Sequence, residues 1–227
     1  MQPIKRVYVD VDFDKRIRIP ASFIRSLPKR VVLFTTIQYV KQIDAIKAQL
    51  ALKGVKVDIV KTRHTAHPGQ IYGCNIEPLR TRCDAFVFVG DGLFHPNALL
   101  IGNDKKVFMY SPETRQSKVI SRKDIDRMEK RRMAAYGRFL QSTHVGVLVS
   151  LKSGQNFMHK ALSLKEAFPQ KRFYFLVSDE IDLARLEDWP FIEVFINTAC
   201  PRIGFDDTHR MPKPLIDISS VPGFKNQ

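Results

Sequence analysis

The chain has few cysteines and lacks a long hydrophobic run. Its three cysteines, Cys74, Cys83 and Cys200, are odd in number and widely spaced, which argues against a disulfide framework. No two of them form a CxxC pair, so a zinc ribbon is excluded. No apolar run approaches the roughly 18 residues of a membrane span, and the N-terminal run alternates charged and apolar residues, unlike a signal peptide. We therefore expect a cytoplasmic protein with no membrane association.

Acidic residues are also scarce relative to basic ones. The 227 residues include 37 Lys and Arg against 23 Asp and Glu, a formal net charge of +14. With 44% hydrophobic and 26% charged residues, the composition is that of a globular protein and not of a disordered one. The positive excess favours an acidic or nucleic-acid partner without specifying which.

Short apolar segments alternate with segments of helical period. Several of the apolar segments lack polar residues almost completely, as do parallel strands buried on both faces. The predicted strands are residues 7–13, 31–36, 55–60, 85–89, 107–110, 145–150, 172–177 and 191–198. The predicted helices are residues 37–53, 122–140 and 157–168. This alternation predicts an α/β fold with parallel sheets.

The strand–helix–strand pattern occurs twice, once on each side of a polar stretch at residues 110–123. We therefore predict two similar α/β domains, residues 1–118 and 119–227, each a small parallel sheet flanked by helices. The tail after Pro212 is predicted to be a loop, with residues 215–218 as its one apolar run.

Three loops follow apolar strands and are candidate ligand sites, because open parallel sheets bind ligands beyond the carboxyl ends of their strands. They are residues 69–75, 90–96 and 197–202. Two of them carry a cysteine, Cys74 in one half and Cys200 in the other. These thiols have two interpretations, as ligands of an iron–sulfur cluster or as small buried hydrophobic groups. Cys83 enters a buried strand, so we expect it to pack in the core.

The second loop contains Gly90-Asp91-Gly92, a turn with few side chains. Such a turn lets the backbone approach a ligand closely, although many loops use the same residues for turn formation alone. His95 follows shortly after. It is either a proton carrier or ligand, or a loop histidine with its hydrogen bonds satisfied.

Basic residues are densest in the helix predicted at 122–140. Such a run is usually a solvated face, and the alternative is a surface for an acidic protein or RNA. No RNA-binding signature accompanies it, and its aromatic residues are too few for a stacking platform, so we favour the solvated face. The basic residues are Arg122, Lys123, Arg127, Lys130, Arg131, Arg132 and Arg138.

Three runs at the candidate loops, taken in order, resemble one known family. They are Gly73-Cys74-Asn75, the run CDAFVFVGDGLFH at 83–95 and the run NTACPRIGFD at 197–206. In this order they resemble the diphthamide synthase family, also named 2-(3-amino-3-carboxypropyl)histidine synthase. Residues 7–12 and Lys213-Pro214-Leu215 resemble the family as well, so the resemblance covers nearly the whole chain.

The resemblance implies a radical transferase. Family members have three similar α/β domains, and each domain gives one cysteine to a central 4Fe–4S cluster. S-adenosylmethionine binds the iron that no cysteine ligates, and its reductive cleavage gives a 3-amino-3-carboxypropyl radical. The radical adds to a histidine of translation elongation factor 2, which is the first step of diphthamide biosynthesis. For this chain the resemblance implies Cys74 and Cys200 as metal ligands.

Residues near S-adenosylmethionine are predicted from loop position together with the resemblance. Arg202, beside Cys200, is interpreted either as offsetting the cluster charge or binding a carboxylate, or as an ion-pair partner of Asp206 or Asp207. The predicted cofactor-binding residues are Gly90, Asp91, Gly92, His95 and Arg202.

The sequence departs from the family pattern because the first domain, with its own cysteine motif, does not appear in this chain. Two thiolates leave such a cluster under-ligated. We favour a first domain supplied by another chain, and expect a dimer. The alternatives are a fragment of a longer protein, substitution by Cys83, or a non-catalytic relative.

Two other functions stay open at this point. The first is a non-catalytic interaction subunit that holds elongation factor 2 or a catalytic subunit without a cluster. The second is an RNA- or nucleotide-binding α/β protein, which the net charge of +14 favours and the lack of an RNA motif disfavours.

Overall fold

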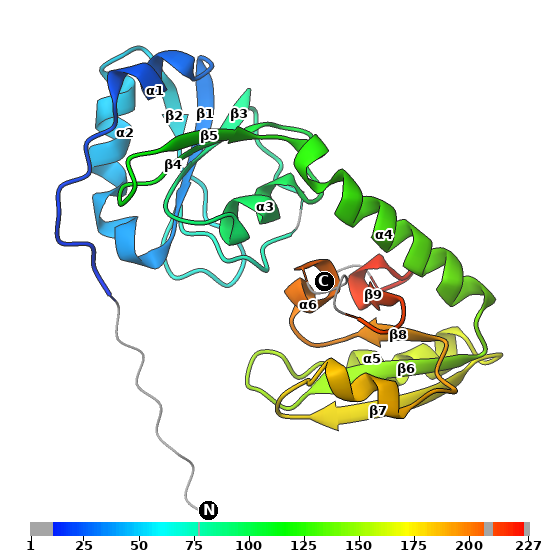
Figure 1. The fold of residues 1–227 in the computed structure, drawn as a ribbon. Helices are drawn as coiled ribbons and strands as arrows, with labels where there is room; N and C mark the ends of the chain where they lie inside the picture. The colour runs from blue at the N-terminus through cyan, green and yellow to red at the C-terminus, as the bar shows by residue number, and fades with distance from the viewer. Residues whose placement is uncertain (1–10, 77, 207–210, 225–227) are drawn as a thin grey trace, which may run out of the picture. The chain divides into compact units, whose positions relative to one another are not determined.

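The computed structural model describes residues 11–76, 78–206 and 211–224. The chain divides into two compact units, Met1–Ile125 and Asp126–Gln227, each with its own sheet (Figure 1). The division falls inside helix α4 (Arg122–Gln141), a few residues after the boundary predicted at 118. The difference arises because strand β5 (Ser117–Ile120) pairs with β4 (Val107–Tyr110) and so belongs to the first sheet.

The first unit is a five-stranded sheet in the order β2-β1-β3-β4-β5. All of its pairings are parallel except that of β4 with β5, which is antiparallel. The central strands β1 and β3 are buried on both faces, as their unbroken apolar sequence predicts. The remaining elements are α1 (Ala21–Ser26), β1 (Arg30–Thr35), η1 (Ile37–Gln42), α2 (Ile43–Ala51), β2 (Lys56–Asp58), β3 (Ala85–Val89) and α3 (Phe94–Leu100).

Helix α2 covers the first sheet through the apolar stripe that its sequence predicts. Ile43, Ile46 and Leu50 are buried three to four residues apart and join the core formed by β1 and β3. Strands β1 and β3 run in register, with Thr35 opposite Val89. The loops that follow these two strands therefore begin at the same edge of the sheet.

The second unit is a four-stranded sheet in the order β7-β6-β8-β9, and all of its pairings are parallel. The prediction of an α/β fold with parallel sheets flanked by helices is thus confirmed. The elements are β6 (His144–Ser150), α5 (Met158–Ala167), β7 (Arg172–Ser178), η2 (Ala184–Asp188), β8 (Val194–Asn197), α6 (Pro201–Asp206), β9 (Leu215–Asp217) and η4 (Ile218–Ser220).

Two predictions about chain segments need correction. The tail was predicted to be a loop, but residues 215–217 form β9, whose buried residues pair with β8 and extend the sheet. The strand predicted at 7–13 lies outside the described residues up to residue 10, and residues 11–13 are not in a strand. Phe13 is instead held by its N–H group, which donates to the carbonyl of Gln38 at 2.8 Å.

Gly146, in the middle of β6, leaves room for a neighbouring ring. A Cβ atom at this position would lie 2.5 Å from the ring of Phe195 and 3.0 Å from Ile192. Phe195 is fully buried and cannot move aside. We therefore expect Gly146→Ala to lower the free energy of unfolding by about 1–3 kcal/mol, measured by urea denaturation.

Gly137 provides the matched control for this substitution. It lies in α4, and a Cβ atom there would meet nothing within 4 Å. Gly137→Ala should raise stability by up to about 1 kcal/mol, because alanine favours a helix over glycine. Equal effects of the two substitutions would contradict the packing described for Gly146.

Candidate functional site

The loop that carries Cys74 is attached to the carboxyl end of β1. The N–H of Thr35 donates to the carbonyl of Gly69 at 2.8 Å, and the N–H of Ile71 donates back to Thr35 at 2.9 Å. Gly69 has a φ of +76°, and a Cβ there would lie 2.0 Å from the side chain of Ile43, so only glycine fits. These contacts place the Cys74 loop where parallel sheets bind ligands.

Cys74 itself lies in a turn that is fixed by Asn75. The buried side chain of Asn75 accepts a hydrogen bond from the Tyr72 N–H at 2.7 Å and donates to the carbonyl of Arg63 at 2.8 Å. The Asn75 N–H also donates to the carbonyl of Tyr72 at 3.0 Å. The turn thus has a buried amide as its anchor, while Cys74 is exposed.

The chain leading to Cys74 is held by further buried polar side chains. The Thr62 hydroxyl donates to the carbonyl of Gln70 at 2.9 Å. The side-chain oxygen of Gln70 accepts from the N–H groups of Ala66 and His67. Sequence reasoning missed Thr62 and Gln70, because nothing in the sequence distinguishes these polar residues from solvated ones.

The structure brings the Gly90-Asp91-Gly92 loop next to the Cys74 loop. A Cβ atom added to Gly73 would lie 2.1 Å from the ring of Phe94, so the ring at the start of α3 lies directly over the turn. Gly92 has a φ of +70°, and among the described residues no atom outside Gly92 and its two chain neighbours lies within 4 Å of its Cβ position. The turn therefore presents open backbone beside the cysteine loop.

Asp91 has hydrogen-bond partners within the protein. Its carboxylate accepts from the hydroxyls of Tyr39 and Ser111. Burial, followed by the hydrogen bond to Asp91, raises the pKa of the Tyr39 hydroxyl. These contacts fix the Gly90–Gly92 turn against η1 and the start of the hairpin that follows β4. The predicted role of Asp91 toward a cofactor stays a prediction.

His95 lies in α3 among aromatic rings. Its ring is stacked on that of Phe88, with centroids 6.3 Å apart, and it meets the ring of Phe94 edge to face at 5.2 Å. Because Phe94 also lies over Gly73, His95 lies close to both the Cys74 loop and the Gly90–Gly92 loop, which together we call the loop cluster.

In the second unit, Cys200 follows β8 on a loop anchored at the carboxyl end of β6. The N–H and hydroxyl of Thr198 donate to the carbonyl of Leu148 at 3.0 and 2.8 Å. Asn197 is fully buried, and its amide nitrogen donates to the carbonyl of Cys200 at 2.9 Å and to Asp217 at 2.8 Å. Cys200 is partly exposed. A buried asparagine thus supports each of the two cysteine loops.

Asp217 completes this support from β9. Its carboxylate accepts from the N–H of Ser219 at 3.0 Å and from the Ser219 hydroxyl at 2.6 Å, in addition to the amide of Asn197. Burial raises the pKa of the Asp217 carboxyl, although the hydrogen bonds from Ser219 and Asn197 act in the opposite direction.

The raised pKa of Asp217 predicts a pH dependence of stability. The folded state keeps this proton at pH values where the unfolded carboxyl, with a pKa of about 4, has lost it. The contribution of Asp217 to stability therefore falls as pH rises from about 4 through the higher folded pKa. Urea denaturation should show the wild type losing stability relative to Asp217→Asn over this interval. If the difference in unfolding free energy between wild type and Asp217→Asn stayed constant with pH, the raised pKa of Asp217 would be contradicted.

The other predicted residues are placed as follows. Arg202 is 4% exposed in the first turn of α6. Its suggested partner Asp207, and the side chain of Asp206, lie outside the described part of the chain. Cys83 is buried just before β3, with its sulfur 3.3 Å from the Thr81 hydroxyl, as expected for core packing.

Among the residues that the structure describes, neither unit gathers a complete metal site of its own. Within the described ranges, no group of three or more His, Cys, Asp or Glu side chains is placed to hold a metal ion. Each unit instead presents one accessible cysteine on an anchored loop, which fits the thiolate chemistry of an iron–sulfur ligand. Each unit could therefore supply one cysteine ligand to an iron–sulfur cluster, and further ligands would be needed to complete it.

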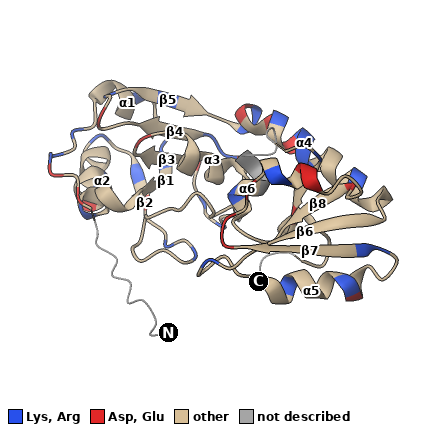
Figure 2. Ribbon diagram, turned by 60° about the horizontal axis from the view of Figure 1, so that its bottom comes forward, with Lys and Arg blue, Asp and Glu red and all other residues tan. Residues whose placement is uncertain are grey.

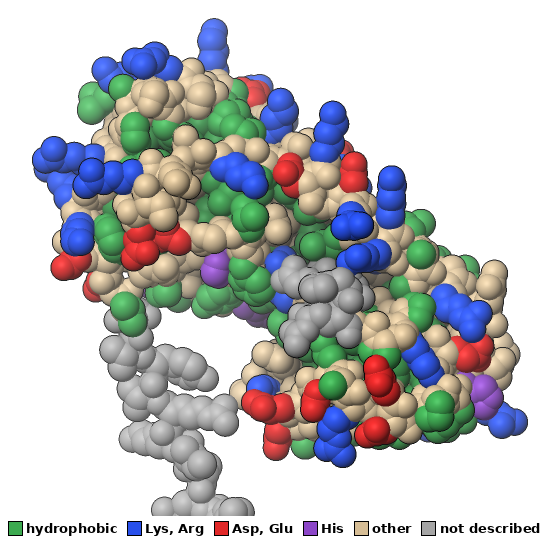
Figure 3. Space-filling model, in the orientation of Figure 1, with side chains coloured by type: hydrophobic (Ala, Val, Ile, Leu, Met, Phe, Trp, Pro, Cys, Tyr) green, Lys and Arg blue, Asp and Glu red, His purple; other side chains and the backbone are tan. Residues whose placement is uncertain are grey.

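The basic helix α4 carries acidic residues between its cations (Figure 2). Arg132 contacts Glu129 at 2.7 Å, and Arg122 contacts Asp104 at 2.8 Å. Figure 3 shows Lys and Arg side chains projecting from α4 into solvent on the face in view. Of the helices in the described ranges, only α4 has the length of a membrane span, and its charges exclude that role.

Comparison with known proteins gives the family. Residues 2–220 match the model of the family described as "Putative diphthamide synthesis protein". The chain belongs to this diphthamide synthesis family, as the motifs in its loops predict.

Named relatives and a solved structure agree with this assignment. The 2-(3-amino-3-carboxypropyl)histidine synthase of Pyrococcus horikoshii is 30% identical over 201 residues, which cover 87% of this chain and 58% of that protein. Subunit 1 of the enzyme of the same name from Homo sapiens is 27% identical, over 92% of this chain and 48% of its own length. The crystal structure of Dph2 from Pyrococcus horikoshii with a 4Fe–4S cluster superposes with a TM-score of 0.75 at 26% identity, covering 88% of this chain and 58% of that one. The chain thus spans about half the length of these curated relatives.

Proposed function

We propose that this chain is part of a cytoplasmic 2-(3-amino-3-carboxypropyl)histidine synthase, in which Cys74 and Cys200 ligate a 4Fe–4S cluster. The observation that carries the proposal is the common construction of the two cysteine loops. Each cysteine lies on a loop that is hydrogen-bonded to the carboxyl end of a parallel strand, is accessible, and belongs to a turn held by a buried asparagine, Asn75 or Asn197. The Dph2 homologue with a 4Fe–4S cluster supports the same chemistry.

When bound, the cluster would supply the electron that cleaves S-adenosylmethionine and releases its 3-amino-3-carboxypropyl group as a radical. The chain's own residues would orient the substrate and exclude water. Gly92 offers open backbone for close approach. The cation of Arg202 suits the carboxylate of the methionine group, and His95 lies in the same loop cluster as Gly90. The acceptor of the group is a histidine of translation elongation factor 2.

A third cysteine is needed, and we propose that another chain or domain supplies it. Two thiolates are fewer than the cluster requires, and the chain covers 58% of the Pyrococcus relative. If another chain supplies it, the working enzyme is a dimer or a larger assembly.

The proposal is tested by purifying the tagged chain from its own cells without oxygen, together with whatever binds it. We expect a brown complex with about four irons per cluster and a companion polypeptide that carries a further cysteine motif. A complex that contains the companion but no iron would contradict the proposal. That result would support the second candidate, an interaction subunit without a cluster, which the incomplete ligand set within the described residues favours.

A further inference from the structure

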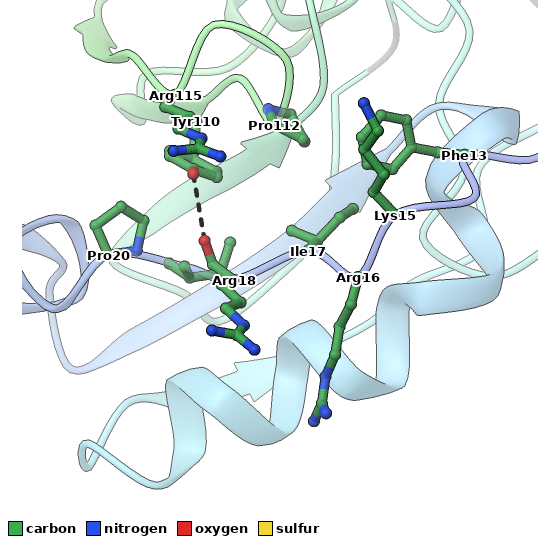
Figure 4. A pocket seen from close by; sticks show the side chains of 10 residues that line it. Phe13, Lys15, Arg16, Ile17, Arg18, Pro20, Tyr110, Pro112 and Arg115 are labelled. Atoms are coloured by element: carbon green, nitrogen blue, oxygen red, sulfur yellow. Dashed lines mark hydrogen bonds between the residues drawn. The ribbon is translucent and has the colours of Figure 1, made fainter.

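A groove in the first unit lies between residues 13–20 and the hairpin that joins β4 to β5 (Figure 4). Its volume is about 520 Å³, and it shares no lining residue with the Cys74 loop. The residues that matter for its chemistry are Phe13, Lys15, Arg16, Arg18, Tyr110 and Arg115.

One edge of the segment beside the groove is already paired. The N–H groups of Ile17 and Ile19 donate to the side-chain oxygens of Gln42 at 2.8 Å and Gln49 at 2.9 Å. The amide nitrogens of the same two glutamines donate back to carbonyls of residues 13, 15 and 17. This edge is therefore closed by side chains of η1 and α2.

The opposite edge of the segment faces the groove. Backbone groups of successive residues in an extended chain point in opposite directions, so Arg16 and Arg18 face away from the glutamines. Tyr110 donates its hydroxyl to the carbonyl of Arg18 at 3.2 Å (Figure 4). Among the described residues, nothing pairs with the N–H or C=O of Arg16 or with the N–H of Arg18. An unpaired extended edge of this kind is a template for another strand.

The charges around the groove are of one sign. Lys15 and Arg115 come from its two walls, Arg16 and Arg18 line it as well, and no Asp or Glu is among its lining residues (Figure 4). Phe13 and Tyr110 add apolar surface. The combination of an open backbone edge with apolar and cationic walls favours an extended acidic peptide over a phosphate polymer, which has no strand edge to pair.

We propose that this groove binds an extended, acidic peptide segment of a partner protein. The peptide backbone would pair with Arg16 and Arg18, and its carboxylates would meet Lys15 and Arg115. The proposal does not depend on the cluster and goes beyond the synthase function.

The test uses a fluorescein-labelled peptide of about eight alternating Glu and Val residues, a usual strand length, and fluorescence anisotropy with the intact chain at low salt. We expect saturable binding that Lys15→Glu and Arg115→Glu each weaken by roughly threefold to tenfold. Lys53→Glu, an exposed residue outside the groove, is the matched control and should leave binding within about twofold. Methylation of alternate peptide amides should also weaken binding, because it removes backbone donors.

Several results would overturn the proposal. One is no saturable binding. Another is equal displacement of the peptide by polyphosphate or poly(U) RNA, which would make the groove a general anion surface. A third is self-association of the chain that Arg115→Glu abolishes, which would make a second copy the occupant.

Discussion

Cys200→Ala is expected to remove most of the iron from the anaerobically purified complex, and Cys74→Ala is expected to do the same. A 4Fe–4S cluster is held by thiolates, and loss of one from a set of three leaves a second of the four irons without a protein ligand. Iron content should fall from about four per complex to below about one, and the visible absorption of the cluster should disappear. Iron analysis and absorption spectra of variants purified in parallel measure both quantities.

Cys83→Ala is the matched control because it removes the third thiol of this chain. Cys83 is buried before β3 and packs against Thr81. This variant should keep its iron and lose about 1 kcal/mol of stability through the smaller side chain. Loss of iron in Cys83→Ala with retention in Cys74→Ala would reassign the ligand in the first unit.

Asn197→Ala is expected to destabilise the second unit by about 2–4 kcal/mol. The substitution removes the amide that donates to both the Cys200 carbonyl and Asp217. It leaves the buried carboxylate of Asp217 with fewer donors, and unsatisfied buried polar groups are costly, more so when charged. The free energy of unfolding from urea denaturation measures the loss.

Asn156→Ala is the control, since its exposed side chain accepts one bond, from the N–H of Met158 at 3.2 Å. It should cost no more than about 1 kcal/mol. Asn197→Asp gives an independent check. It places a second carboxylate beside Asp217, so its destabilisation should grow as pH rises. Wild-type stability in Asn197→Ala would show that this network does not hold the Cys200 loop.

The sequence predicts the buried strands best. Residues 85–89 and 107–110 match β3 and β4 because strands covered on both faces are apolar throughout. Strand β5 escapes prediction because three of its four residues are exposed. Helix α3 is not predicted because it is short and contains Pro96. Strand β9 is not predicted because a segment of three residues shows no periodicity.

The same limit applies to the site. Glycine and cysteine motifs indicate where the loops lie, so Cys74, Gly90 and Cys200 were predicted as candidate residues. Their supports were not, because Asp217 lies twenty residues from Asn197 in the chain and pairs with it only through the register of β8 and β9. The segment beside the groove, residues 13–20, is likewise held by side chains distant in the sequence. Gln42 lies 25 residues from Ile17, and Gln49 lies 30 residues from Ile19.

We propose that the assembly containing this chain transfers a 3-amino-3-carboxypropyl group to a histidine. The most direct test incubates the anaerobic complex with S-adenosylmethionine, a reductant and elongation factor 2, followed by mass spectrometry of the histidine-containing peptide. We expect the group to be added to one histidine, and Cys200→Ala to prevent the addition. A cluster-bearing complex that leaves this histidine unmodified would contradict the proposal.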